Sequence, residues 1–505
     1  MQAAPDRSGM LESPWRLRLH PFLVDVLTTG LVQVAILLAN LIMVGVISKK
    51  MGVVVLGEYL LVKRVSAWVL SGSQLGLGVA LPRQIAHTVK DEETRAKQYF
   101  LAAFTTVVVF VTCLGLAAAL NAQRAARWCF GSENSGLVYA LVLLLFGTAV
   151  HSMVFGYFRG LQRVRMANLL ALGGLAVVPM LALWATQGLH SAPILMGTTG
   201  MGLALVSMIC ALPKIAAVQH IRQHFFGDAR QLLTYGIARV PGDFAMGGLL
   251  TLGPVLASHY VNMTENSYLL LGITCLSMAG VAFSPVGIVL LARISHLLGA
   301  GRVGDVNEYV GHMRSAVLQL SLVLAVQGLI FARPLVLWWL GPSSMAGVAV
   351  IRMLLLGVPA YMYFVAMRSV VDAASPVAYN AKSVLLALIV LLVLSAAVIH
   401  FCPQERFVLG MAAATTLAMW VLAVATHRTL HALALAELLP RFGSLGVGLL
   451  LTATSLSAQW AFHFQITKPA FAVVLLVNVG LAILFLRKFQ PPWLGFMLRV
   501  AFQTI

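Results

Sequence analysis

The segment "AKSVLLALIVLLVLSAAVIH", Ala381 to His400, decides the fold class of this 505-residue chain. It contains one charged side chain, Lys382, and that residue lies at its start. About 20 apolar residues in a helix cross the roughly 30 Å hydrocarbon core of a bilayer. We therefore interpret this segment as a transmembrane helix.

Apolar segments of similar length recur along nearly the whole sequence, in which 60% of residues are hydrophobic and 10% are charged. The runs are continuous and do not alternate, which predicts helices and not a membrane barrel. The sequence thus predicts an all-α polytopic membrane protein of about 14 transmembrane helices. The predicted spans are 23 to 48, 55 to 81, 99 to 120, 136 to 158, 167 to 187, 193 to 211, 232 to 257, 267 to 291, 315 to 332, 347 to 367, 381 to 400, 407 to 426, 444 to 463 and 470 to 486.

Basic residues are distributed unequally between the two sides of these spans. With the N-terminus inside, 23 of the 34 Lys and Arg residues lie at inner loops or ends, and eight lie outside. By the positive-inside rule this bias predicts that both termini are cytoplasmic. A basic surface facing anionic lipid accounts for the net charge of +18, so we expect no nucleic-acid partner. Residues 1 to 22 lack the apolar core of a removable signal peptide.

Signatures of catalysis are missing from the sequence. No lysine follows a glycine, so the P-loop motif is absent and we expect no ATP hydrolysis by that route. The loops between spans are shorter than the roughly 50 residues of an independent domain. We expect a protein that is not an enzyme and needs no cofactor or metal. A membrane-embedded glycan polymerase or acyltransferase is the alternative of another class, but it would usually need a sizeable outer loop with catalytic groups.

An internal repeat appears when the first spans are compared with the seventh and eighth. At an offset of 209 residues, "YLL" at Tyr59 to Leu61 aligns with "YLL" at Tyr268 to Leu270, and "IAH" at Ile85 to His87 aligns with "ISH" at Ile294 to His296. Six spans separate the copies, so both copies have the same orientation, as in transporters with parallel repeats. This predicts two pseudo-symmetric six-helix lobes followed by two C-terminal helices, with a transport cavity between the lobes.

The predicted organisation follows directly from these spans. It comprises a cytoplasmic N-terminal segment (1–22), an N-lobe (23–211), a cytoplasmic linker (212–231), a C-lobe (232–426), a second cytoplasmic linker (427–443), two further spans (444–486) and a cytoplasmic tail (487–505).

Three motifs carry a resemblance to a known family. They are "SQLGLGVALPRQIA" at Ser73 to Ala86, "GYFRGLQRVRMAN" at Gly156 to Asn168 and "MGVVVLGEYLL" at Met51 to Leu61. The first, with its Gly-Leu-Gly pair followed by Arg and Ile-Ala, resembles the second-span signature of Wzx-type polysaccharide exporters in the multidrug/oligosaccharidyl-lipid/polysaccharide (MOP) superfamily. The others resemble that family's junction after span four and its entry to span two.

The resemblance implies a flippase that translocates undecaprenyl-pyrophosphate-linked oligosaccharide across the bacterial inner membrane for exopolysaccharide, capsule or lipopolysaccharide O-antigen synthesis. It also implies a polysaccharide polymerase and a chain-length regulator as partners, besides the lipid-linked glycan and membrane lipid. Lipid II flippases and ion-coupled multidrug exporters share the architecture, so both remain alternatives.

A pyrophosphate cannot cross hydrocarbon unpaired, so a flippase needs cations along its path. Lys63, Arg64 and Arg239 lie within or close to predicted spans and are candidate substrate-binding residues, with Asn40 and Gln74 as candidate sugar contacts. Lys63 and Arg64 are about 100° apart on a helix and are not expected to serve one ligand equally. Lysine and arginine can also snorkel to the interface, and buried amides often bridge helices.

The stretch "YGIARVPGDFA", Tyr235 to Ala245, combines charges with residues that break helices. Arg239 and Asp243 are four residues apart, so a helix would place them on one face as a charge pair. Pro241 lacks an amide hydrogen, which predicts a bend in this span. Asp243 is also a candidate for ion coupling, together with Glu58, for which a position at the span entry is the alternative.

Overall fold

The computed structural model describes residues 21–88, 93–216, 225–299, 301–375, 377–435, 452–457, 460 and 467–489. All regular structure in these ranges is helical. Residues 21–216 form the first half: α1 Pro21–Val46, η1 Ile47–Met51, α2 Val53–Ser73, α3 Leu77–His87, α4 Glu93–Leu120, α5 Ala122–Phe130, α6 Ser135–Gly160, α7 Val164–Leu172, η2 Gly173–Val177, α8 Val178–Thr186, η3 Gln187–Leu189 and α9 Ala192–Ala216.

We call the elements of residues 225–432 the second half, and one further helix follows them in the described residues. The elements are α10 Phe225–Ile237, α11 Val240–Ala257, α12 Met263–Gly299, α13 Val303–Leu340, η4 Pro342–Gly347, α14 Val348–Leu355, α15 Val358–Ala374, α16 Tyr379–Phe401, η5 Gln404–Arg406, α17 Phe407–Ala432 and α19 Lys468–Phe489.

The chain is an all-α polytopic membrane protein, as the sequence predicts. Within the described residues, nine helices are long and apolar enough to span a bilayer, and one bent pair would make a tenth. Helices also occupy each of the twelve predicted spans between residues 23 and 426, and α19 occupies the last one. The α2 helix is not among the nine, and it carries three charged side chains, Glu58, Lys63 and Arg64. Most of predicted span 444 to 463 lies outside the described residues.

Several predicted spans are not single straight helices. The second consists of α2 and α3, which are separated by a turn in which Gly76 has a φ of 72°. The seventh consists of α10 and α11, which are separated at Ala238 and Arg239. In the tenth, α15 is bent by 46° from the helical segment before it. Residues 225 to 231, assigned to a linker from the sequence, are the first part of α10.

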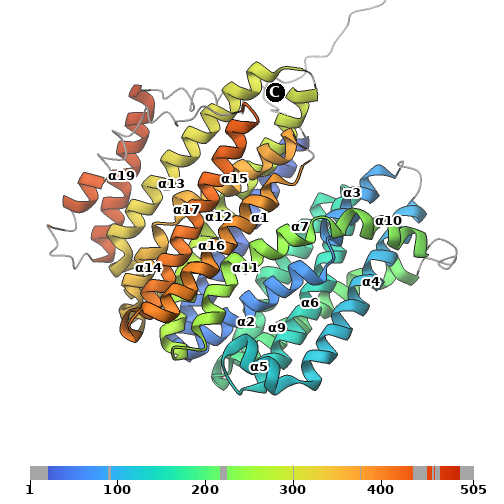
Figure 1. Ribbon diagram of the computed structural model, residues 1–505, viewed down its shortest axis with the longest axis horizontal. Coiled ribbons are helices and arrows are strands. Elements are labelled where there is room, and N and C mark those ends of the chain that lie inside the picture. The colour runs from blue at the N-terminus through green and yellow to red at the C-terminus, as the bar shows by residue number, and fades with distance from the viewer. Residues whose placement is uncertain are drawn as a thin grey trace, which may run out of the picture.

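Apolar clusters join the first half to α11–α17 at one end of the bundle, and at the other end the first half packs with α10. Figure 1 shows the cyan and turquoise helices of the first half, with the green α10, beside the yellow and orange helices of the second half. One buried cluster joins Met43 and Leu61 of the first half to Leu270 and Ile351 of the second. A separate cluster around Phe100 contains residues of the first half and α10, and a third contains only second-half residues. The shared core lies at the end that the sequence predicts to be outside.

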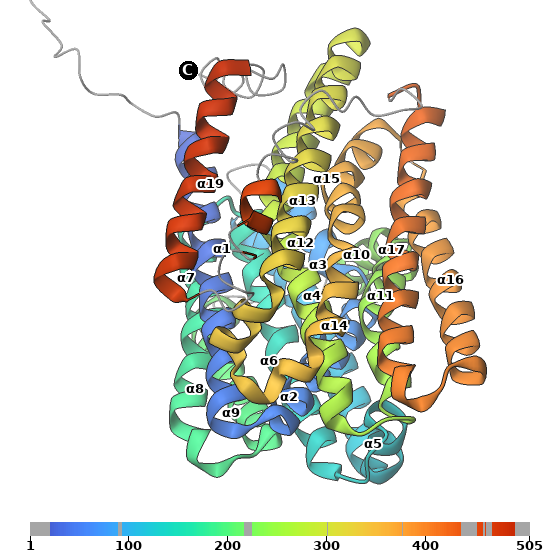
Figure 2. The same ribbon diagram turned by 90° about the vertical axis from the view of Figure 1, so that its left-hand side faces the viewer.

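Polar contacts reinforce the closure at this predicted outer end. The Ser48 hydroxyl in η1 donates to the carbonyl of Leu340 at 2.8 Å. Lys49 Nζ donates to the carbonyl of Trp338 at 2.6 Å, and the Trp339 indole donates to the carbonyl of Leu41 at 2.7 Å. Figure 2 shows α1 between the two halves, where it contacts α7 and α8 on one side and α12 and α13 on the other.

The α10 helix packs on the first half, although its sequence precedes the second. Arg95 of α4 forms two hydrogen bonds to the carboxylate of Asp228, at 2.7 and 3.1 Å. The same guanidinium donates to the Tyr99 hydroxyl, which donates to the side-chain oxygen of Gln231 at 3.0 Å. A bidentate arginine–carboxylate pair is a directional contact, so it fixes α10 against α4.

The C-terminal helix α19 packs against the outer part of α13. Its Phe471 ring lies 5.0 Å from that of Phe331 and 5.3 Å from that of Trp338, measured between centroids. Asn478 donates to the Ser455 hydroxyl, which donates to the side-chain oxygen of Gln327 on α13. Gln327 therefore bridges helices, which was the alternative to sugar binding for the buried amides.

Candidate functional site

The α2 helix lies at the centre of the molecule, between the two halves. It packs on α6 and α9 of the first half and on α11 and α12 of the second. Close approach depends on Gly57, because an added Cβ there would collide with the hydroxyl oxygen of Ser267 on α12. Small residues allow membrane helices to approach in this way. Charged side chains on α2 are therefore held where the two halves meet.

Arg64 crosses from α2 into the second half. Its Nη2 atom donates to the backbone carbonyl of Ile273 at 3.0 Å and to the Ser277 hydroxyl at 2.6 Å, both on α12. Tyr361 of α15 and Cys275 are the titratable groups that interact electrostatically with it. In the described part of the chain no carboxylate forms an ion pair with Arg64. The structure thus holds a half-buried cation, hydrogen-bonded to neutral acceptors, at the junction of the halves.

Lys63 points in a different direction from Arg64. Its Nζ atom donates to the side-chain oxygen of Asn40 on α1 at 2.5 Å and lies 5.6 Å from the centre of the Tyr59 ring. Asn40 in turn donates to the carbonyl of Ile36 at 2.8 Å. The Lys63 side chain is exposed, although the helix around it is largely covered. Two of the predicted site residues, Lys63 and Asn40, therefore lie together.

Glu58 and Gln74 lie apart from this pair. Glu58 is half-buried on α2, five residues before Lys63, which places it about 140° around the helix. Gln74 follows the last residue of α2, and its side-chain oxygen lies over Gly78 at the start of α3. Ten residues separate Gln74 from Arg64, or roughly 15 Å along a helix. The structure therefore does not bring either residue to Lys63 or Arg64.

Arg239 and Asp243 lie at the N-terminal end of α11, and both are exposed. The predicted charge pair is not formed, because no ion pair joins them in the described structure. The Arg239 guanidinium lies 5.7 Å from the centre of the Tyr235 ring, on α10. The charged groups that act on the Asp243 carboxylate are Arg239 together with Arg368 and Asp372 of α15.

Pro241 lies in the first turn of α11, where its missing amide hydrogen costs no helical hydrogen bond. The helix is interrupted just before Pro241, because α10 ends at Ile237 and α11 begins at Val240. The sequence predicts a bent helix here, whereas the structure has two helices joined by a turn.

Sequence reasoning missed four residues that complete these environments. Ser277 and Tyr361 surround Arg64, and Arg83 and Tyr235 accompany Arg239. Only Tyr235 stands near a candidate in the sequence, and its position four residues before Arg239 is the one available signal. Among the described residues no group of His, Cys, Asp and Glu is placed to hold a metal ion.

No protein-family profile matches the chain, and no curated protein matches it at a significant level. Solved structures are similar to it over most of its length. The lipid II flippase MurJ, in an inward closed conformation, has a TM-score of 0.67 at 12% identity and covers 93% of this chain and 100% of its own. The Vibrio cholerae MATE transporter VcmN in its bent form has a TM-score of 0.54 at 18% identity, covering 82% and 98%.

A MOP superfamily transporter from Pyrococcus furiosus has a TM-score of 0.55 at 14% identity, covering 81% of this chain and 95% of its own. At these identities the comparisons establish the fold alone. The chain therefore has the fold of MOP superfamily transporters, in agreement with the superfamily that the sequence motifs resemble. The Wzx-type family itself is not identified by these comparisons.

Proposed function

We propose that this protein is a flippase that moves undecaprenyl-diphosphate-linked oligosaccharide across the bacterial inner membrane by alternating access. The observation that carries the proposal is Arg64, a half-buried cation at the junction of the two halves that pairs with no carboxylate in the described structure. Charged residues within a membrane protein are rare, and those that face its interior mark candidate substrate paths. A diphosphate on a lipid is an anion that would reach this depth.

Lys63 supports the same assignment because its exposed ammonium lies one residue away, beside an amide that can bind sugar hydroxyls. Arg64 would hold the diphosphate by bidentate hydrogen bonds, and Lys63 with Asn40 would contact the next group of the substrate. Asp243 and Glu58 are the carboxylates that could couple transport to a proton or sodium ion.

The distribution of apolar cores supports alternating access. The clusters that join the first half to α11–α17 lie at the predicted outer end, whereas at the predicted inner end the first half packs with α10. Such an arrangement would suit a transporter whose halves separate at the cytoplasmic end, where lipid-linked precursors would enter. Rocking of residues 23 to about 211 against residues 232 to about 426 would open the other side. A polysaccharide polymerase and a chain-length regulator are the partners that we propose for the exported product.

The lipid II flippase is the second candidate. The likeness to MurJ extends over 93% of this chain, and a lipid-linked diphosphate requires the same cations. An exporter of cationic drugs fits less well, because Lys63 and Arg64 would repel a cation in the central region.

Reconstitution tests the proposed function. In proteoliposomes, the purified protein should move a fluorescent short-chain prenyl-diphosphate oligosaccharide between leaflets without ATP, measured as the fraction that an impermeant quencher can reach. Protein-free liposomes and liposomes with heat-denatured protein serve as controls. Efflux of a cationic dye without movement of the glycan lipid would instead support a drug exporter, and preferred movement of lipid II would support the second candidate.

Cysteine labelling tests the proposed orientation. In a variant without the five native cysteines, single cysteines at the exposed positions Arg163 and Phe226 should react with an impermeant maleimide only after the membrane is permeabilised. Cysteines at the exposed positions Gln123 and His190 should react in intact spheroplasts. The positive-inside distribution is the physical reason. The opposite labelling pattern would place both termini outside.

A further inference from the structure

Two arginines from different halves of the molecule meet at one aromatic ring. Arg83 of α3 has its guanidinium carbon 4.3 Å from the centre of the Tyr235 ring, and Arg239 at the start of α11 has its own at 5.7 Å. Both distances are within the range of cation–π attraction. The two guanidinium carbons are therefore no more than 10 Å apart.

The two positive charges are not neutralised by direct pairing. In the described part of the chain neither Arg83 nor Arg239 belongs to an ion pair, and both side chains are exposed. Asp243, one turn into α11, acts on Arg239 electrostatically without pairing with it. A guanidinium held near a ring by cation–π attraction still has N–H groups that can donate to an anion. The N–H donors of both guanidinium groups are therefore available to an anion.

The backbone around this arginine pair is held firmly. Gly76, before α3, and Gly236, at the end of α10, approach so closely that a Cβ on either would collide with backbone atoms of the other segment. The Arg95–Asp228 pair fixes the other end of α10 to α4. Tyr235 is therefore part of a rigid corner, and the two arginines are oriented by a ring that does not move freely.

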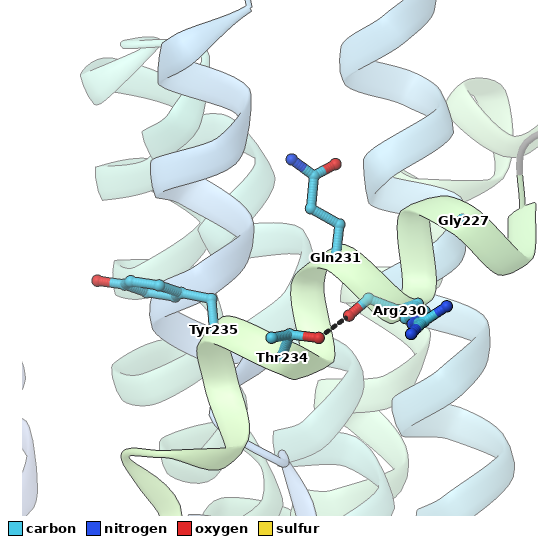
Figure 3. A pocket seen from close by; sticks show the side chains of 5 residues that line it. All are labelled: Gly227, Arg230, Gln231, Thr234 and Tyr235. Atoms are coloured by element: carbon cyan, nitrogen blue, oxygen red, sulfur yellow. Dashed lines mark hydrogen bonds between the residues drawn. The ribbon is translucent and has the colours of Figure 1, made fainter.

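A pocket of about 510 Å³ adjoins the same tyrosine. It is lined along one side of α10 by Gly227, Arg230, Gln231, Thr234 and Tyr235, as Figure 3 shows. It is an open depression along the surface of α10, and most of its lining is apolar. Arg230 adds a third cation, whereas the side-chain oxygen of Gln231 accepts from Tyr99 and the Thr234 hydroxyl donates to the carbonyl of Arg230. The cations and the pocket meet at Tyr235, which is the arrangement required for an anion that carries a polar substituent.

We propose that Arg83, Tyr235 and Arg239 form a diphosphate-binding site at the inner end of the bundle, which receives the lipid-linked substrate before it reaches Arg64. The inference rests on the proposed function for the identity of the substrate. The diphosphate binds the two guanidinium groups, and the group that it carries lies along the pocket of α10. Gln74 and Gly76, between α2 and α3, mark the level of this site, and the ten residues from Arg64 to Gln74 separate it from Arg64 by roughly 15 Å.

Equilibrium binding to the full-length protein in nanodiscs of phosphatidylcholine tests this site. Inorganic pyrophosphate and geranyl diphosphate are titrated, and heat is measured by calorimetry. Arg83→Gln and Arg239→Gln should each weaken binding about tenfold or more, as expected for a charge-assisted hydrogen bond. The Tyr235→Phe variant should bind diphosphate more tightly than Tyr235→Leu, because phenylalanine keeps the aromatic ring that both arginines contact. Arg163→Gln, an exposed arginine predicted on the same side, is the matched control and should bind as the wild type does.

The outcomes separate this site from the proposed function. If diphosphate binding depends on Arg83 and Arg239 but the protein moves no glycan lipid, the site is supported and the lipid-linked glycan is rejected as the substrate. The site would be overturned if the wild type transports glycan lipid and the double variant Arg83→Gln/Arg239→Gln still binds diphosphate as the wild type does. The melting temperature of the variant must show that it is folded. If phosphatidylglycerol in the nanodiscs competes fully with geranyl diphosphate, the site binds phospholipid headgroups and the assignment to substrate is wrong.

Discussion

Replacing Gly76 with alanine should remove most of the protein from the membrane fraction. Gly76 has a φ of 72°, a conformation that costs an alanine about 1–2 kcal/mol. An added Cβ would also collide with the carbonyl group of Gly236 on α10. The colliding atoms belong to the backbone, so no side-chain rotation relieves the contact. Losses of this size change the abundance of a protein several-fold.

Gly30→Ala is the matched control for this prediction. Gly30 lies within α1, and a Cβ there would meet no atom within 4 Å. Alanine also favours a helix more than glycine does, so this variant should accumulate normally. Immunoblotting of membranes and the melting temperature of purified protein measure the difference. Equal abundance of the two variants would show that the contact between α3 and α10 does not stabilise the fold.

The positions of the membrane helices could be predicted from hydropathy, because a span needs only about 20 consecutive apolar residues. The interruptions within these membrane helices could not be predicted in this way. A hydropathy average does not register that Gly76 adopts a positive φ, nor that α10 separates from α11 at Ala238. Pro241 marks the second interruption in the sequence, yet it lies after the break, in a first turn that tolerates proline.

The candidate site was predictable where it depended on one helix. Lys63 and Arg64 are adjacent, so they had to point in different directions, and they reach Asn40 and Ser277 respectively. The partner of Arg64 on α12 lies 213 residues away, and spacing alone does not identify it. Its other acceptor, Ile273, lies 209 residues away, which is the offset of the internal repeat. Parallel copies packed beside a common axis would produce such a contact.

The prediction of an ion pair between Arg239 and Asp243 was wrong for a local reason. Arg239 is the N-cap residue of α11, and its carbonyl accepts from the amide of Asp243 at 3.1 Å, as helical spacing requires. Its side chain nevertheless lies near Tyr235 on α10 and does not reach the carboxylate. The turn between the two helices therefore changes the partner of this arginine from a carboxylate to an aromatic ring.

Arg64→Ala should lower the rate of glycan-lipid translocation about a hundredfold or more while the protein remains abundant in the membrane. Two charge-assisted hydrogen bonds to a diphosphate would contribute about 1.5–3 kcal/mol each. Removing the side chain strands no opposite charge, because its acceptors are the carbonyl of Ile273 and the hydroxyl of Ser277. That hydroxyl also donates to the carbonyl of Thr274 at 2.9 Å, so it keeps a partner.

Two further variants distinguish a substrate-binding cation from a structural one. Ser277→Ala removes one hydrogen bond of Arg64 but keeps the positive charge, so translocation should fall by no more than a few-fold. Arg64→Lys should recover only part of the activity, because an ammonium lacks the planar fork of a guanidinium. Initial rates in proteoliposomes and protein level are measured together. If Ser277→Ala impairs transport as strongly as Arg64→Ala, the contact between α2 and α12 is what matters, and Arg64 does not bind the diphosphate.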